Sequence, residues 1–148
     1  MFDSLVDARR TLDKISVAFD ASVLSPQAAA RVVDELAWIR NVVDAMIAKT
    51  AKRVAETSER DGAARVARSL GVGRGVAQAA IDNAASLEQL PATDAAVREG
   101  RLSAGQAQMI AAAATANPAA ELDLLEIAEQ GLVPLRDACR GPRRGRRS

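Results

Sequence analysis

Histidine and tyrosine are absent from this 148-residue sequence, and cysteine and tryptophan each occur once. Without histidine there is no Ser-His-Asp or Cys-His nucleophile pair, no imidazole acid or base, and no histidine-containing zinc site. The single cysteine, Cys139, excludes an internal disulfide and a cysteine-only metal cluster. These absences remove much of enzyme chemistry. We therefore expect a protein that acts by binding, without a catalytic site, a metal ion or a cofactor.

Long apolar runs are also missing. The first ten residues place acids and arginines where a signal peptide needs an uninterrupted apolar core. The longest run of small apolar residues, 109–116, is far shorter than the roughly 18–20 residues that span a bilayer. We therefore expect a cytoplasmic chain that does not contact a membrane.

The composition favours helices. Alanine accounts for 33 residues and proline for only five, which is typical of closely packed helices. No alternating strand pattern of useful length and no internal repeat is present. The sequence predicts an all-α, multi-helix bundle in a single domain over 1–139, followed by a disordered, arginine-rich tail over 140–148. Within the domain we expect a helix over 1–20, a long helix over 26–60 and short helices over 63–139.

Basic charge is concentrated in two places, although the net charge is only +1. Residues 40–78 hold eight basic and four acidic side chains, whereas residues 79–139 hold three and nine. The last nine residues, RGPRRGRRS, carry five arginines and no acid. This tail is a phosphate-binding arm, a solvated chain end without a role, or the product of a shifted reading frame in a GC-rich gene. An arm of this kind would bind DNA through Arg143, Arg144, Arg146 and Arg147.

Two amphipathic helices are expected in the first 60 residues. The first carries an apolar face that we expect to dock on a neighbour, and Ser25-Pro26 is a start signal for the second. The second carries a stripe at spacings of three and four, which is either a coiled-coil seam in a homodimer or the spine of a monomeric bundle. Its extra width favours the bundle, and we expect Trp38, on its flank, to pack partly buried. The face consists of Phe2, Leu5, Val6, Leu12, Ile15 and Phe19, and the stripe of Val32, Leu36, Ile39, Val43, Met46, Thr50 and Val54, widened by Val33, Val42 and Ile47.

Residues 63–81 have the outline of a helix-turn-helix, with Gly71 permitting the left-handed turn. DNA-binding versions place the second helix in the major groove. Arg65 and Arg68 would then meet phosphates, while Arg74 and Gln78 would face base edges. However, a glycine follows the turn where a capping serine or threonine is usual, and the second helix has few side chains suited to reading bases. A short helical hairpin is also a common packing device, so both interpretations stay open.

Three further patterns concern the second half of the chain. Ser103 and Gln106 have the spacing of a capping box. Cys139 lies between arginines, so we expect its thiol to ionise somewhat easily, but it has no partner base. The acidic side chains near the end favour the wet face of an amphipathic helix over a metal site, because no second cluster converges on them. They are Glu121, Asp123, Glu126 and Glu129.

Residues 89–114, QLPATDAAVREGRLSAGQAQMIAAAA, resemble a known family. This is domain of unknown function 222, the N-terminal helical domain that precedes an HNH endonuclease module in many actinobacterial proteins. A weaker likeness links the helix-turn-helix outline, Leu-Pro and Gly-x-Leu-Ser to the central region of ParB-type partition proteins. The family likeness covers most of residues 30–140 and is carried by Leu70-Gly71, Leu90-Pro91, Gly100, Leu102, Ser103, Gln106, Ala107, Ile110 and the segment LLEIAEQGLVPLRDACR.

The resemblance implies an all-helical fold and an association with DNA-cleaving proteins. The chemistry of such proteins belongs to the HNH module, whose histidines bind a divalent metal and activate water. No catalytic residue carries over, because this chain has no histidine. We expect a truncated protein of this kind, without its nuclease half.

Three functions therefore remain open, besides a fragment without one. The favoured one is a DNA-associated positioning or assembly module. The second is a structural or oligomerisation module that acts through the long helix, with no direct DNA binding. The third is an enzyme in its own right, with metal-dependent nicking through Asp123 or Glu126.

Overall fold

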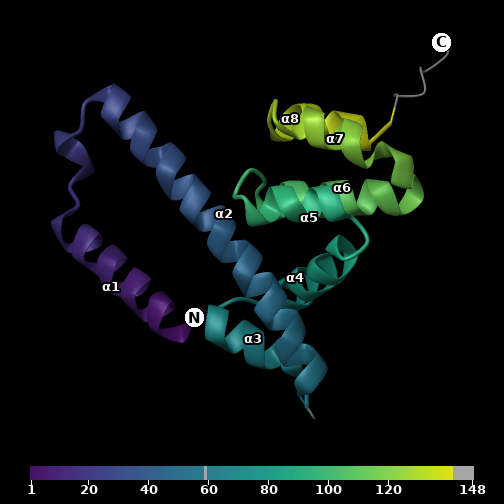
Figure 1. Ribbon diagram of the computed structural model, residues 1–148, viewed down its shortest axis with the longest axis horizontal. Helices are drawn as coiled ribbons and strands as arrows, with labels where there is room; N and C mark the ends of the chain where they lie inside the picture. Colours follow the sequence, from purple (N-terminus) through teal and green to yellow (C-terminus); the bar gives the residue numbers. More distant parts are fainter. Residues whose placement is uncertain (59, 142–148) are drawn as a thin grey trace. The chain divides into compact units, whose positions relative to one another are not determined.

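The computed structural model describes residues 1–58 and 60–141, and these residues form eight α-helices, two short 3-10 helices and no strand (Figure 1). The prediction of an all-α fold is confirmed. The α-helices are α1 (Phe2–Ala18), α2 (Pro26–Thr57), α3 (Gly62–Leu70), α4 (Arg74–Leu87), α5 (Pro91–Arg98), α6 (Ala104–Ala116), α7 (Glu121–Ala128) and α8 (Leu132–Cys139). The 3-10 helices are η1 (Ala21–Val23) and η2 (Pro118–Ala120). No helix in the described part of the chain is long and apolar enough to cross a bilayer.

Capping side chains define where several helices begin, as the sequence predicts. The hydroxyl of Ser25 accepts a hydrogen bond from the backbone N–H of Ala28 at 3.2 Å, at the start of α2. Ser103 and Gln106 form the predicted capping box at the start of α6. Helix α2 ends at Thr57 rather than near residue 60. Asp61 then caps α3 by accepting a hydrogen bond from the N–H of Ala64.

Backbone contacts divide the chain into two units, Met1–Leu36 and Ala37–Ser148, with the boundary inside α2. In the first unit no residue of α1 is buried. Its apolar face is exposed to solvent, with Phe2 76% and Ile15 54% accessible. Within Met1–Leu36 the expectation that this face docks on a neighbour is therefore wrong. In the part of α2 that belongs to this unit, Val33 and Leu36 are exposed as well.

The second unit has a core made largely of small side chains. Helix α6 contacts α4, α5, α7 and α8 (Figure 1). Ala77, Ala96 and Ala107 are fully buried, together with the larger Ile110 and Leu135. Alanine at these positions lets the helix axes approach closely, although each alanine removes little apolar area from water. The high alanine content thus reflects the close packing that the composition predicts.

Helix α2 docks on the short helices mainly through a face other than the predicted stripe. The inner face of α2 consists of Trp38, Asn41, Ala45, Lys49 and Lys52, and the outer face, which belongs to the stripe, consists of Ile39, Val43, Met46 and Thr50. At about 100° per residue, the two faces are turned by roughly 130° from each other. Val43 and Met46 on the outer face remain exposed. The interpretation of the stripe as a bundle spine is therefore wrong for the middle of the helix, although Val54 packs against the buried cluster of α3 and α4 and Val42 lies beside Gly100. The short helices offer α2 backbone carbonyls and carboxylates, which select polar and small partners.

A glycine corner after α5 is the closest point of this docking. Gly100 has φ +74°, a conformation that side chains with a Cβ rarely adopt. A Cβ there would lie 2.7 Å from the indole ring of Trp38. The Trp38 Nε1–H donates to the carbonyl of Glu99 at 2.9 Å, and the Asn41 amide donates to the carbonyl of Gly100 at 3.0 Å. Side chains of α2 therefore satisfy carbonyls at the C-terminal end of α5.

The residues after this corner fix the start of α6. Leu102 is buried, and the capping box of Ser103 and Gln106 follows it. The Gln106 side chain also donates to the carbonyl of Ala128 at 3.1 Å, at the end of α7. Residues 100–106, which carry much of the family resemblance, therefore hold the helices together.

The substitution Gly100→Ala is expected to lower the free energy of unfolding by about 2–4 kcal/mol. The new methyl group would require a left-handed backbone and would displace the indole of Trp38. Gly105→Ala is the matched control. This glycine is the second residue of α6, and the nearest atom to a new Cβ lies 3.9 Å away. The control should raise the free energy by about 0.5–1 kcal/mol. Urea titrations measure both, and equal effects would contradict the role of the corner.

Candidate functional site

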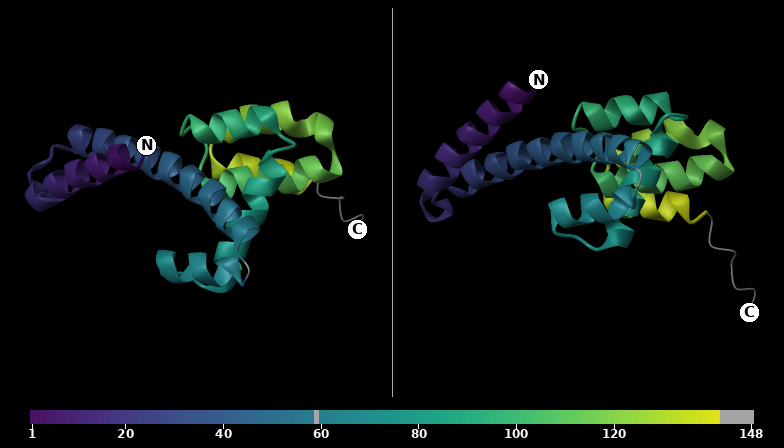
Figure 2. Two further views of the ribbon diagram at one scale, coloured as in Figure 1. Left: turned by 60° about the horizontal axis from the view of Figure 1, so that its bottom comes forward. Right: turned by 90° about the horizontal axis from the view of Figure 1, so that it is seen from below.

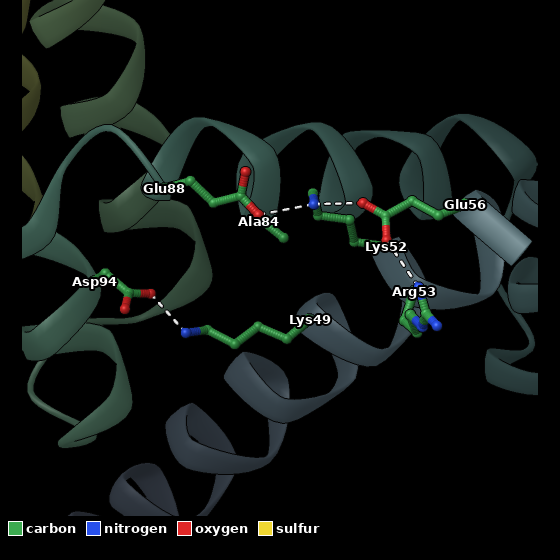
Figure 3. A pocket seen from close by; sticks show the side chains of 7 residues that line it. All are labelled: Lys49, Lys52, Arg53, Glu56, Ala84, Glu88 and Asp94. Atoms are coloured by element: carbon green, nitrogen blue, oxygen red, sulfur yellow. Dashed lines mark hydrogen bonds and ion pairs between the residues drawn. The ribbon is translucent and has the colours of Figure 1, made fainter.

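A pocket of about 290 Å³ lies among the C-terminal half of α2, α4 and α5 (Figure 3). Its charged lining consists of three basic and three acidic side chains. The Lys49 ammonium lies 2.8 Å from a carboxylate oxygen of Asp94. Figure 3 shows the Lys52 ammonium between the carboxylates of Glu56 and Glu88, at 2.5 Å and 2.7 Å. The charges in the pocket balance one another, so the site does not favour an ionic ligand of either sign.

The pKa values in this pocket argue against proton transfer. Hydrogen bonds to Glu56 and Glu88 raise the pKa of Lys52, and the hydrogen bond from Lys52 lowers the pKa of Glu56. A general acid or base needs a pKa near the working pH. Both groups move away from neutrality, which makes the pocket an ion-pair cluster that joins α2 to α4. Among the described residues there is also no group of three or more potential metal ligands.

The second candidate site is the α3–α4 unit, which consists of α3, the turn at residues 71–73 and α4. It packs through Val66 and Ala67 on α3 and Ala77 and Ile81 on α4, against the end of α2. Gly71 has φ +67° and ends α3 in the left-handed conformation, as the sequence predicts. Figure 1 shows α3 far from α7 and α8, and Figure 2 gives two further views of the same helices. One side of the unit is therefore open to a large ligand.

The structure places Arg65 and Arg68 on α3, three residues apart and exposed. Neither arginine joins the ion pairs found among residues 1–58 and 60–141. Side chains at this spacing share one helix face. The two guanidinium groups therefore provide positive charge on the outside of α3, while Val66 and Ala67 are buried.

The two residues expected to face base edges have partners within the unit. Arg74, the first residue of α4, lies 2.6 Å from a carboxylate oxygen of Asp61. The hydrogen bond from Arg74 lowers the pKa of Asp61, and the N–H of Ala64 lowers it further. The Gln78 amide donates to the carboxylate of Asp82 at 2.9 Å. Both side chains must exchange these partners to bind a nucleic acid. The tail residues Arg143, Arg144, Arg146 and Arg147 lie outside the described residues.

The first turn of α4 presents an open backbone. Its N-cap, Gly73, makes no side-chain hydrogen bond to the helix, and residues 73–76 are exposed. A Cβ added at Gly73 or at Gly75 would meet no atom within 4 Å, and neither residue has positive φ. The fold therefore does not require glycine at either position. A helix N-terminus without a capping side chain presents backbone N–H groups to an anion.

Two other side chains differ from the sequence-based interpretation. Glu121 was expected on the wet face of its helix, but it is half-buried and accepts hydrogen bonds from the backbone N–H and the hydroxyl of Thr93, both at 2.8 Å. Thr93, which is fully buried and 28 residues away in the sequence, holds the Glu121 carboxylate in this position. Cys139 is also half-buried, and desolvation raises the pKa of its thiol. The expectation of easy ionisation is therefore wrong, because burial outweighs the neighbouring arginines.

The chain belongs to a family described as a domain of unknown function, DUF222, whose pattern matches residues 25–143. The match includes α2 to α8, the glycine corner, both candidate sites, and Arg140 and Arg143 of the tail. No curated protein and no solved structure matches the sequence. The likenesses to HNH-linked proteins and to ParB-type partition proteins stay predictions.

The substitution Arg74→Gln is expected to raise the pKa of Asp61 towards its ordinary value of 3.8, because it removes the main hydrogen bond to the carboxylate. In the native protein the folded-state pKa lies below 3.8. Any stabilisation by this carboxylate is thus present above that value and is lost as the pH falls through the lowered pKa. NMR titration of the Asp61 carboxyl carbon measures the change. Arg101→Gln, which removes a guanidinium paired with Glu99, should leave Asp61 unchanged. An unaltered titration in Arg74→Gln would show that the ion pair does not form in solution.

Proposed function

We propose that this chain is a non-catalytic helical module that binds double-stranded DNA through the α3–α4 unit. The observation that carries the proposal is the combination of two exposed arginines on α3, which join no ion pair among residues 1–58 and 60–141, with the uncapped, glycine-lined N-terminus of α4. Arg65 and Arg68 supply charge for phosphates, and the first turn of α4 supplies backbone N–H groups. Loss of bound counterions from the DNA would add to the affinity.

The glycines of the unit support this proposal because they serve no evident need of the fold. Gly75 occupies a helical position at which alanine would be more stable by about 0.5–1 kcal/mol. Open space surrounds the position of its missing Cβ, so no packing constraint explains the residue. A glycine does, however, allow a phosphate to approach the backbone closely. The two glycines on either side of Arg74 therefore fit a site that receives an anion.

The ion pair between Arg74 and Asp61 gives DNA binding a built-in competitor. Both partners are exposed, so water and salt screen their attraction. A DNA phosphate, with its own negative field, can take the place of the Asp61 carboxylate at a small cost. Binding through phosphates, rather than through bases, also fits a helix α4 whose Gln78 is already paired with Asp82.

The non-catalytic part of the proposal is supported by the chemistry available in the chain. Histidine is absent from the sequence. The lysines and carboxylates of the pocket in Figure 3 are paired with one another. The thiol of Cys139 has a raised pKa and lies 3.7 Å from the carbonyl of Met109. None of these groups is suited to act as a nucleophile or a general base near neutral pH.

The alternative function is a structural module that acts through the long helix and does not bind DNA directly. The exposed outer face of α2 favours it. DNA titration separates the two functions, because only the first requires an interaction between the α3–α4 unit and a duplex. The measurement is fluorescence anisotropy of a labelled mixed-sequence duplex with the full 148-residue chain at several salt concentrations.

Replacement of Arg65 and Arg68 by alanine is expected to weaken duplex binding several-fold at low salt. Each lost phosphate contact should also reduce the slope of log affinity against log salt by about 0.9. Arg136→Ala, which removes an exposed arginine from α8, is the matched control and should leave binding unchanged. A second variant replaces Arg143, Arg144, Arg146 and Arg147 of the tail by glutamine in the full chain. If binding depends on the tail alone, the proposed role of the α3–α4 unit is wrong.

The substitution Gly75→Ala is expected to change stability and DNA affinity in opposite ways. The alanine should raise the free energy of unfolding by about 0.5–1 kcal/mol because it favours the helix. Its methyl group should weaken DNA binding several-fold, because it obstructs the approach of a phosphate to α4. Gly105→Ala makes the same change at the second residue of α6 and should raise stability alone. Unchanged DNA affinity in Gly75→Ala would remove the argument from the open backbone.

A further inference from the structure

Two side-chain oxygens of the second unit are buried without a hydrogen-bond partner. They are Oδ1 of Asn41, on α2, and Oδ1 of Asn83, on α4, and no donor among residues 1–58 and 60–141 is bonded to either. The Asn41 amide nitrogen donates to the carbonyl of Gly100. This bond fixes which end of the Asn41 amide carries the oxygen, because a carbonyl requires a donor. Native proteins rarely leave buried acceptors unpaired, so both oxygens require an explanation.

Both asparagines line the same small cavity, which lies between α2 and α4 and is bounded by single residues of α5 and α6. Its volume is about 20 Å³. A single water molecule needs roughly 10–15 Å³ of such space. Much of the remaining lining is apolar and buried, including Ala45, Ala84 and Leu87. The cavity therefore has room for one water molecule and for no larger ligand.

We propose that one water molecule occupies this cavity and donates one hydrogen bond to Oδ1 of Asn41 and the other to Oδ1 of Asn83. A water molecule has two hydrogens to donate, which equals the number of unpaired oxygens. A purely apolar cavity of this size would stay dry, whereas polar groups hold a water in place. The bridge joins α2 to α4, and it makes the water a permanent part of the packing between these helices.

The charged groups of the cavity favour water over a metal ion. Lys49 and Asp44 also line it. The Lys49 ammonium, which pairs with Asp94, adds positive charge that repels a cation. The two asparagines and the Asp44 carboxylate also offer few oxygens, whereas Ca²⁺ takes about six to eight oxygen ligands. A cation would thus lose most of its hydration shell without adequate replacement.

The inference goes beyond DNA binding and does not depend on it. The proposed water lies between α2 and α4, whereas the proposed DNA contacts lie on α3 and in the first turn of α4. The water can be detected without nucleic acid, so the failure of one proposal leaves the other intact.

NMR of the full chain with labelled methyl groups tests the proposal through nuclear Overhauser effects from water. The methyl groups of Ala45 and Ala84 line the cavity. Each should show a cross-peak to water whose sign in the laboratory and rotating frames indicates a residence time beyond the nanosecond range. Surface water exchanges too fast to give this pattern. Absence of both cross-peaks would show that the cavity is dry and would overturn the proposal.

The substitution Asn83→Leu removes one of the two acceptors at nearly constant volume and should abolish both cross-peaks. Asn83→Asp keeps an oxygen at this place and should retain them. Gln108→Leu makes the same polar-to-apolar change in the neighbouring pocket between α4 and α6, which Asn83 also lines, and should have no effect. The backbone amide spectrum checks that each variant is folded.

Two further outcomes would overturn the bridge. Asn83→Leu keeps Lys49, so cross-peaks relayed through exchangeable ammonium protons would persist in this variant. Titration with potassium or sodium chloride, compared with choline chloride, tests for an ion. A saturable shift of the Asn83 side-chain amide signals with the metal salts alone would assign the cavity to a cation instead of water.

Discussion

The arrangement of the second unit depends on the contact between α2 and the glycine corner at residue 100. A chain that leaves a helix must find partners for its last carbonyls, and here the indole of Trp38 and the amide of Asn41 supply two of them. Such hydrogen bonds require the α2 backbone to come close, which only a residue without a Cβ permits at the corner. The corner also sets the start of α6, and α6 contacts four other α-helices. The absence of a Cβ at Gly100 thus governs the packing of most of the unit.

The two sides of α2 show how far hydrophobic periodicity predicts a fold. The spacing of Val43 and Met46 identifies the helix correctly, but it does not reveal which side faces the other helices. That side is chosen by what the short helices present, namely the carbonyls of Glu99 and Gly100 and nearby carboxylates. A partner surface made of polar atoms and small side chains binds a tryptophan, an asparagine and lysines. The sequence of one helix cannot contain this information, because it belongs to the other helices.

Local signals were the more reliable ones. Ser25 and the pair Ser103 and Gln106 act within four residues, so the sequence alone predicted their roles in capping. The candidate DNA-binding side chains could be placed on the correct helices for the same reason. Their partners could not be foreseen, because the contact between Arg74 and Asp61 spans a turn and that between Thr93 and Glu121 joins two separate helices. Burial and pairing across such distances emerge only after the chain has folded.

Trp38 has a spectroscopic consequence. It is the only tryptophan, and the chain has no tyrosine, so ultraviolet emission excited at the red edge of protein absorption comes from this indole alone. Its N–H binds the carbonyl of Glu99, and its ring contacts the position of Gly100. The half-exposed ring experiences a different polarity when α2 leaves the short helices. The wavelength of the emission therefore reports on this junction alone, and comparison with circular dichroism would reveal whether α2 detaches before the helices unwind.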